Sequence, residues 1–355
     1  MKRILPLLIL TVFAGIAIIG IIPGCDELIT NEYYDTIADT VTLMDSSCVK
    51  MCHSDFNTDM EAALRQWHNS PHALAVLTDD TAMGLEAADC GARCHSHEGF
   101  VKSLSNISGS VDFPTPINCF TCHKPHTQPY DFSLRDSSEI TLADGSSIYN
   151  LNQSNICARC HQSLVDKLSS ITNNMLIGET WDSLVYHGWA DAEMIIGTGG
   201  YEYNIVTYEH SGHDAAVNGC VTCHQEKAEG FMLGGHSLNI RDMSNPDIIL
   251  LEACNGTGCH ATAPLSTDTI NALQAYVLSK LDTLEQQLLD DDMLLILGDI
   301  VIPNPDMIFQ TADSAGALYN YFYIKNDRSS GMHDFVYDTL LLESSIKYLR
   351  GDYTP

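Results

Sequence analysis

Positive charge is scarce in this chain of 355 residues, which has 17 lysines and arginines against 46 aspartates and glutamates. The formal net charge of −29 leaves no basic face that could neutralise phosphates, so nucleic acid is excluded as a partner. The sequence also gives no local support for a Ser/His/Asp triad or for a pair of catalytic carboxylates. The acidic surplus favours solubility and partners with basic surfaces.

Cysteine, by contrast, is abundant, and nearly all of it occurs in one repeated pattern. Thirteen cysteines are too many for a reducing compartment unless they bind something. Twelve of them form six pairs, and a histidine directly follows the second cysteine of every pair. In chain order the strings are CVKMCH, CGARCH, CFTCH, CARCH, CVTCH and CNGTGCH, called motifs 1 to 6 below.

The pattern is typical of covalent haem c attachment. Three strings have the usual two-residue spacer, two have three residues and one has four. The two thiols reach the vinyl groups on one edge of the porphyrin, and the next residue turns its imidazole under the iron. Zinc sites and disulfides do not require a histidine after every second cysteine. The sequence therefore predicts six haem c groups, each holding one iron.

The residues that attach these haems follow directly from the motifs. The predicted thioether cysteines are Cys48, Cys52, Cys90, Cys94, Cys119, Cys122, Cys157, Cys160, Cys220, Cys223, Cys254 and Cys259. The predicted proximal iron ligands are His53, His95, His123, His161, His224 and His260.

The first 24 residues have the pattern of an export signal. Lys2 and Arg3 precede an apolar run without charge over residues 4–22. The run ends in IPGC, which resembles the lipobox of bacterial lipoproteins, where the peptide is cut before the cysteine and the cysteine is acylated. An uncleaved transmembrane helix is the alternative. Because Cys25 is the one cysteine outside the six pairs, we predict a signal peptide and lipidation at Cys25.

The sixth ligand of each iron separates electron transfer from catalysis, because an open position can bind a substrate. Nine of the 15 histidines remain for this role after the proximal six. They are His68, His72, His97, His126, His187, His210, His213, His236 and His333.

Several of these histidines lie in strings that resemble those of bacterial multihaem cytochromes c related to the octahaem and nitrite-reductase-like chains. The strings are SPHA, CHKPH, GGHS and a histidine that opens the last predicted helix. The resemblance, which spans about residues 48–350, implies six distal ligands: His72, His126, His187, His213, His236 and His333. His68 and His97 remain rivals, and His210 is interpreted as a neighbour of His213.

The predicted fold is mainly α with much irregular loop, built around stacked haems, with a C-terminal helical segment. Helical spacing of apolar residues predicts helices over 267–290, about 312–324 and 333–349. We expect four regions. They are the signal peptide 1–24, an acidic tether 25–47, a hexahaem domain 48–262, and a C-terminal segment 263–355 that supplies His333.

Electron transfer is the function that six closely spaced haems favour. If every iron holds two histidines, none is left for a substrate, so no catalytic residue is assigned. The expected partners are redox proteins with basic docking surfaces, in a respiratory chain of the cell envelope. The protein itself is expected to be exported and held on a membrane by its lipid anchor, facing the periplasm or the cell exterior. A reductase of a nitrogen or sulfur oxyanion with one open haem is the alternative. The sequence lacks the lysine-containing haem motif of ammonia-forming nitrite reductases. Oligomers or filaments also remain open.

Overall fold

The computed structural model describes residues 57–74, 91–107, 111, 114–124, 132–176, 190–256, 258–298 and 300–353. The chain divides into two compact units, residues 1–62 and 63–355. The predicted signal peptide, the lipidation site Cys25 and the acidic tether lie outside the described residues. Of the helices that fall within the described ranges, none has the length and hydrophobicity needed to cross a membrane.

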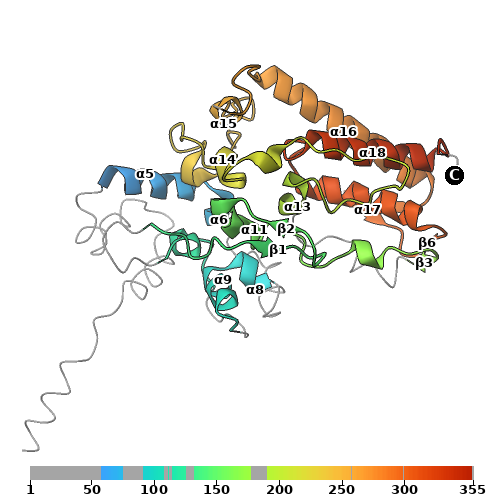
Figure 1. Cartoon of the computed structure of the whole chain (residues 1–355), viewed down its shortest axis with the longest axis horizontal. Coiled ribbons are helices and arrows are strands. Elements are labelled where there is room, and N and C mark those ends of the chain that lie inside the picture. Colours follow the sequence, from blue (N-terminus) through green and yellow to red (C-terminus); the bar gives the residue numbers. More distant parts are fainter. Residues whose placement is uncertain are drawn as a thin grey trace, which may run out of the picture. The chain divides into compact units, whose positions relative to one another are not determined.

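Short helices, turns and irregular loops make up the region that carries the motifs (Figure 1). Its α-helices are α5 (Asn57–His68), α6 (Pro71–Leu74), α8 (Gly91–His95), α9 (His97–Leu104), α10 (Cys119–Cys122), α11 (Asn155–Ala158), α13 (Asp191–Ile195), α14 (Cys220–His224) and α15 (Glu252–Asn255). Single 3-10 turns are η1 (Asn152–Ser154), η2 (Leu168–Ser170), η3 (His213–Ala215) and η4 (Gly235–Ser237). The prediction of a mainly α fold with much loop is confirmed.

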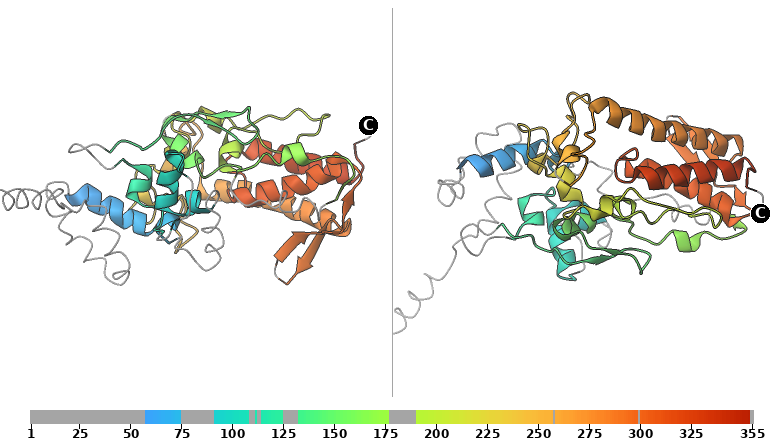
Figure 2. Two further views of the ribbon diagram at one scale, coloured as in Figure 1. Left: turned by 90° about the horizontal axis from the view of Figure 1, so that it is seen from below. Right: turned by 45° about the horizontal axis from the view of Figure 1, so that its top comes forward.

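The strands are few and short, and each pairs with one antiparallel partner. They are β1 (Ile140–Thr141) with β2 (Ile148–Tyr149), β3 (Met175–Leu176) with β6 (Ile308–Phe309), and β4 (Leu294–Leu297) with β5 (Ile300–Pro303). The β4–β5 hairpin extends beside the C-terminal helices, as the orange arrows of Figure 2 show. The β3–β6 pair joins residues far apart in the chain, with Met175 opposite Phe309.

Three longer helices follow the last motif: α16 (Thr267–Asp290), α17 (Ala312–Asp327) and α18 (Phe335–Leu349). The first has the predicted bounds, the second runs three residues further than expected, and the third begins two residues later. Each starts at a side-chain cap, because Ser266, Thr311 and Asp334 accept hydrogen bonds from backbone N–H groups of the first turn. His333 therefore precedes the helix cap instead of lying within α18.

The largest apolar core lies among these three helices. Both α16 and α17 pack against α18, and the buried side of α16 carries Ile270, Val277, Leu281, Leu284 and Leu288 at helical spacing. The core extends to Met194 in α13 and to Phe309 in β6. Two smaller clusters lie near the motifs, one around Tyr149 and one around Leu250. The C-terminal helices thus form an ordinary apolar core, and α13 packs against it.

Candidate haem sites

In four of the motifs, the first cysteine lies in a short helix of about one turn, and each motif has its own helix. Cys119, Cys157, Cys220 and Cys254 lie in α10, α11, α14 and α15, and the second cysteine of motif 2 lies in α8. Residues three apart on a helical turn point to the same side. A two-residue spacer therefore places both thiols on one face with the histidine next in line. The turn of motif 3 is fixed by a capping box in which the Asn118 side chain accepts from Phe120 N and Thr121 Oγ1 accepts from Asn118 N.

The predicted attachment cysteines within the described residues form no disulfide, and they are Cys94, Cys119, Cys122, Cys157, Cys160, Cys220, Cys223, Cys254 and Cys259. Cys48, Cys52, Cys90 and the proximal histidine His53 lie outside the described residues.

Thiols of motifs 2, 4 and 5 lie next to one another. A hydrogen bond with Cys160 lowers the pKa of Cys94 to about 7. A hydrogen bond with Cys157 lowers the pKa of Cys220 to about 5. Motif 4 therefore contacts motif 2 through one of its thiols and motif 5 through the other. Groups attached at these cysteines would be neighbours in the order 2, 4, 5.

Three motif histidines lie opposite three of the predicted distal histidines. The ring centres of His161 and His72 are 6.1 Å apart, and those of His123 and His236 are 6.2 Å apart. The rings of His224 and His333 are 6.3 Å apart. Each pair joins one histidine of a motif to one that the sequence analysis proposed as a sixth ligand.

The geometry of these pairs fits the two axial positions of a haem iron. Imidazoles that bind one metal ion from opposite sides through bonds of about 2 Å have ring centres roughly 6 Å apart. His123 and His224 donate from Nδ1 to the carbonyl oxygens of Phe132 and Leu238, both at 2.8 Å. Because a carbonyl only accepts, Nδ1 carries the proton and the lone pair of the neutral ring is on Nε2. Nε2 is then the atom that can bind iron.

Burial keeps several of these histidines in the neutral form that a metal ligand requires. Burial, with the nearby His161 and His224, lowers the pKa of His72 to about 4. It also lowers the pKa values of His224 and His236. The rings are thus free of a competing proton at neutral pH.

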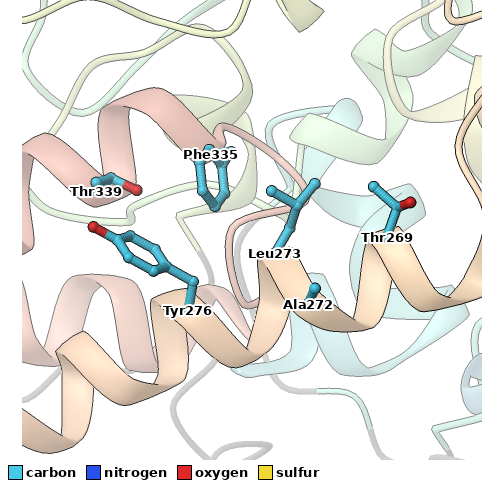
Figure 3. Close-up of a pocket in the computed structure, with 6 residues that line it drawn as sticks. All are labelled: Thr269, Ala272, Leu273, Tyr276, Phe335 and Thr339. Atoms are coloured by element: carbon cyan, nitrogen blue, oxygen red, sulfur yellow. The ribbon is translucent and has the colours of Figure 1, made fainter. Parts of the chain in front are cut away.

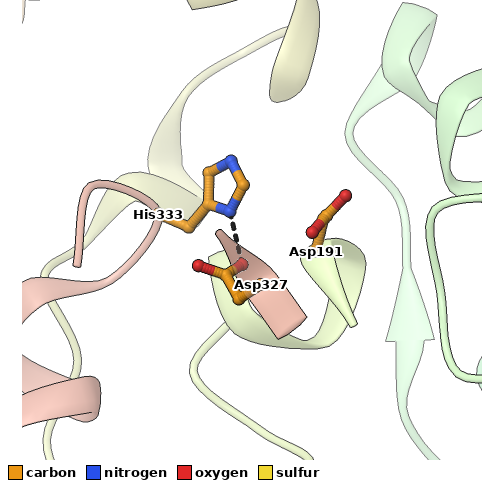
Figure 4. Close-up of side chains that lie close together, drawn as sticks. All are labelled: Asp191, Asp327 and His333. Atoms are coloured by element: carbon orange, nitrogen blue, oxygen red, sulfur yellow. Dashed lines mark hydrogen bonds and ion pairs between the residues drawn. The ribbon is translucent and has the colours of Figure 1, made fainter. Parts of the chain in front are cut away.

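Two histidines have a carboxylate on Nδ1 instead of a carbonyl. His161 donates to Asp191 Oδ2 at 2.8 Å. His333 donates to Asp327 Oδ1 at 2.6 Å, as the dashed line of Figure 4 marks. Burial lowers the pKa of His333, but the charge and hydrogen bond of Asp327 raise it overall, to about 10. Burial likewise opposes a net rise in the pKa of His161, which the bond to Asp191 causes.

Asp191 and Asp327 were not foreseen from the sequence. Their ligand atoms lie within 4.8 Å of one another and of His333, close enough to share a metal ion. Since Nδ1 of His333 is already bonded to Asp327, we interpret the two carboxylates as support for histidine rings and not as a separate metal site. A half-buried aspartate such as Asp191, which contacts a histidine 30 residues away, leaves no local signal in the sequence.

Long-range hydrogen bonds hold the segments that carry the distal histidines. Gln66 Oε1 accepts from the backbone N–H of His236 at 3.0 Å. Asn239 Nδ2 donates to the carbonyl of Asn69 at 3.0 Å, and Trp67 Nε1 donates to the carbonyl of Ile117 at 2.9 Å. These bonds tie the end of α5 to η4 and to the residues before motif 3, so His72 and His236 are placed by one framework.

The remaining predicted ligands have other surroundings or lie outside the described residues. His213 donates from Nδ1 to the carbonyl of His333 at 2.9 Å. His126 and His187 lie outside the described residues, and His95 and His260 lie within motifs 2 and 6 of the described chain. The six distal assignments as a set stay a prediction.

The rival histidines differ in what they contact. Nδ1 of His97 bonds Thr121 Oγ1 at 3.1 Å, and Nδ1 of His210 lies 3.5 Å from Asp214 Oδ1 at the surface. Within the part of the chain that the structure describes, the buried Nε2 of His68 has no hydrogen-bond partner. His68 therefore keeps a nitrogen suited to iron and remains a rival ligand.

A separate apolar pocket of about 400 Å³ lies between α16 and α18 (Figure 3). The residues that line it are Thr269, Ala272, Leu273, Tyr276, Phe335 and Thr339. This lining contains no cysteine, histidine or carboxylate, and the Tyr276 hydroxyl donates to Glu343 at 2.8 Å. The pocket does not offer the chemistry of the predicted site.

No protein-family model and no curated protein sequence matches the chain. Two solved structures are similar to it. One is the outer cell wall cytochrome OcwA, with 18% identity, a TM-score of 0.48, and coverage of 80% of this chain and 49% of that chain. The other is an undecaheme cytochrome from the S-layer of Carboxydothermus ferrireducens, with 16% identity, a TM-score of 0.44, and coverage of 80% and 40%.

Both similar structures are cytochromes, and the chain spans less than half the length of either one. The class to which the motifs and histidine pairs point is that of the bacterial multihaem cytochromes c.

Proposed function

We propose that this chain is an electron-transfer protein that binds six c-type haems covalently, each with two histidine ligands. The observation that carries the proposal is the set of three histidine pairs, with ring centres 6.1 to 6.3 Å apart. Each pair combines a motif histidine with a histidine from a distant segment. If both rings of a pair bound one iron, no open position would remain there for a substrate.

The protein residues bind, orient and shield the cofactors. Cysteines on single helical turns supply the thioether bonds, and hydrogen bonds at Nδ1 direct Nε2 of His123 and His224. When bound, each haem would supply an iron that gains or loses one electron. The adjacent thiols of motifs 2, 4 and 5 support close spacing of three of the six groups.

We further propose that the protein is exported and anchored to the cell-envelope membrane by a lipid on Cys25. The apolar run before Cys25 and the parity of the cysteines support this location. The net charge of −29 favours a redox partner with a basic surface.

The haem-loaded protein provides the direct test. Mass spectrometry should give six covalent haems per chain, and optical and EPR spectra should show only low-spin iron. Carbon monoxide should not bind to the reduced protein. Fewer than six haems would mean that motifs with the longer spacers do not attach haem. Carbon monoxide binding would favour a reductase with an open haem.

A ligand substitution sharpens the test. His72→Ala should convert one iron of the six to high spin, because His161 would lose the ring opposite it. His210→Ala is the matched control, since this exposed ring bonds Asp214. If the His72 variant kept only low-spin iron, the pairing with His161 would be wrong.

A further inference from the structure

Two carboxylates lie between neighbouring histidine pairs. Asp191 accepts from His161, which belongs to the His72/His161 pair, and Asp327 accepts from His333, which belongs to the His224/His333 pair. Figure 4 shows Asp191 and Asp327 on the same side of the His333 ring. One histidine of each pair therefore has a charged acceptor on Nδ1.

Asp191 is held against motif 4 by its own helix. It is the first residue of α13, and the N–H of the next residue, Ala192, donates to the carbonyl of His161 at 2.9 Å. The side chain and the backbone of this turn thus bond the same histidine. This double contact fixes the distance of 2.8 Å between Asp191 Oδ2 and His161 Nδ1.

Asp327 is held at the end of α17 and is only 4% exposed. Its second oxygen, Oδ2, accepts from the backbone N–H of Ser329 at 3.2 Å and from the Ser329 hydroxyl. The N–H of His333 donates to the same hydroxyl oxygen at 3.2 Å. The carboxylate therefore meets the imidazole in a fixed geometry away from water, where its charge is weakly screened.

Two other histidines of these pairs have a neutral acceptor on Nδ1 instead of a charged one. His123 and His224 donate to the neutral carbonyls of Phe132 and Leu238. A carboxylate acceptor makes a stronger, charge-assisted bond than a carbonyl does. It draws the Nδ1 proton away and makes the ring a stronger donor to the metal. Stronger donation stabilises the oxidised iron, and hydrogen bonds beyond the ligands are among the factors that set haem potentials.

We propose that Asp191 and Asp327 are positioning residues that lower the reduction potentials of the two haems bound by His72/His161 and by His224/His333. The haem bound by His123/His236 has a carbonyl at His123 and takes a higher potential. The inference rests on the proposed function, because these histidines must bind iron for it to hold. The haems of the chain would then differ in reduction potential, with two low-potential haems side by side.

The test is a redox titration of the complete haem-loaded protein, followed by EPR of the low-spin irons. Asp191→Asn and Asp327→Asn keep the shape and an acceptor oxygen but remove the charge. Each substitution should shift one one-electron component to a more positive potential and leave the haem content and low-spin state unchanged. The two variants should shift different components.

Asp313→Asn is the matched control, because Asp313 lies in the first turn of α17 and bonds the Tyr201 hydroxyl, not a histidine. It should move no component. Unchanged potentials in both test variants, or an equal shift in the control, would overturn the inference. Absence of haem, or of six-coordinate iron, from the unsubstituted protein would instead overturn the proposed function. If Asp327→Asn does not fold, Asp191→Asn alone decides.

Discussion

At the scale of single residues, the acceptor on one ring nitrogen decides what the other nitrogen can do. A carbonyl or carboxylate on Nδ1 requires the proton there, so Nε2 of the neutral ring keeps its lone pair. This holds for His123, His161, His224, His213 and His333. The shared arrangement is a property of side chains and loops together, and each of these rings presents Nε2 to a metal once it is neutral. His333, whose pKa Asp327 raises to about 10, must release a proton first.

Glu193 gives a residue-scale prediction on pH. It is 4% exposed, and burial, with the nearby Asp191, raises its pKa to about 7. The folded protein therefore binds this proton more tightly than the unfolded chain does. Its contribution to stability is full below about pH 4.5 and is lost as the pH rises through about 7, a change of up to about 3 kcal/mol.

Thermal unfolding of the haem-loaded protein between about pH 5 and pH 8 checks this prediction. The midpoint should fall with rising pH, and Glu193→Gln should flatten that slope. The exposed Glu139 is the matched control, so Glu139→Gln should keep the slope. An equally steep slope in the Glu193 variant would contradict the prediction.

At the scale of elements, single helical turns position the motifs, and the loops before them set how each turn docks. Motif 5 shows this best. Gly219, directly before α14, has φ of 48°, and the Tyr149 hydroxyl lies 3.3 Å from Cys220 Sγ. A Cβ atom at Gly219 would lie 2.7 Å from that hydroxyl and would also meet Ser154. The turn can therefore approach its neighbours only with glycine at this position.

Gly219→Ala should destabilise the protein more than the same change at Gly145. Both residues have positive φ, which costs an alanine about 1 to 2 kcal/mol in the left-handed helical region. The backbone cost is higher at Gly219, whose ψ of −124° lies outside that region. Only Gly219 adds crowding, worth about another 1 to 3 kcal/mol, because a Cβ at Gly145 meets nothing within 4 Å. Denaturant unfolding of the two haem-loaded variants measures the difference. Equal losses would show that the close approach to Tyr149 does not matter.

At the scale of the whole molecule, charge should govern association. The formal net charge of −29 produces a negative field, which extends about 8 Å at physiological ionic strength. Electron exchange with a basic carrier protein should therefore slow by about tenfold or more as salt rises from low to high concentration. Stopped-flow kinetics at several salt concentrations measures this. An acidic carrier is the control and should not slow, and a salt-independent rate with the basic carrier would contradict the prediction.

The apolar cores are distributed as expected for a haem-binding region followed by a C-terminal helical segment. The main cluster lies among α16, α17 and α18, whereas the clusters near the motifs are small. A region whose own apolar core is small needs other surfaces to pack against, and bound porphyrins would supply them. The C-terminal helices contribute His333 from the loop that precedes α18.

The sequence by itself determined the prediction of haem attachment, since each cysteine motif is a contiguous string whose spacing is local. It also determined the helix over 267–290, because its apolar spacing and its cap at Ser266 are local too. The tertiary structure alone decided which histidines lie opposite one another and which carry carboxylates. Partners such as His72 and His161 are distant in the chain, and no local pattern encodes a contact that packing of separate segments creates.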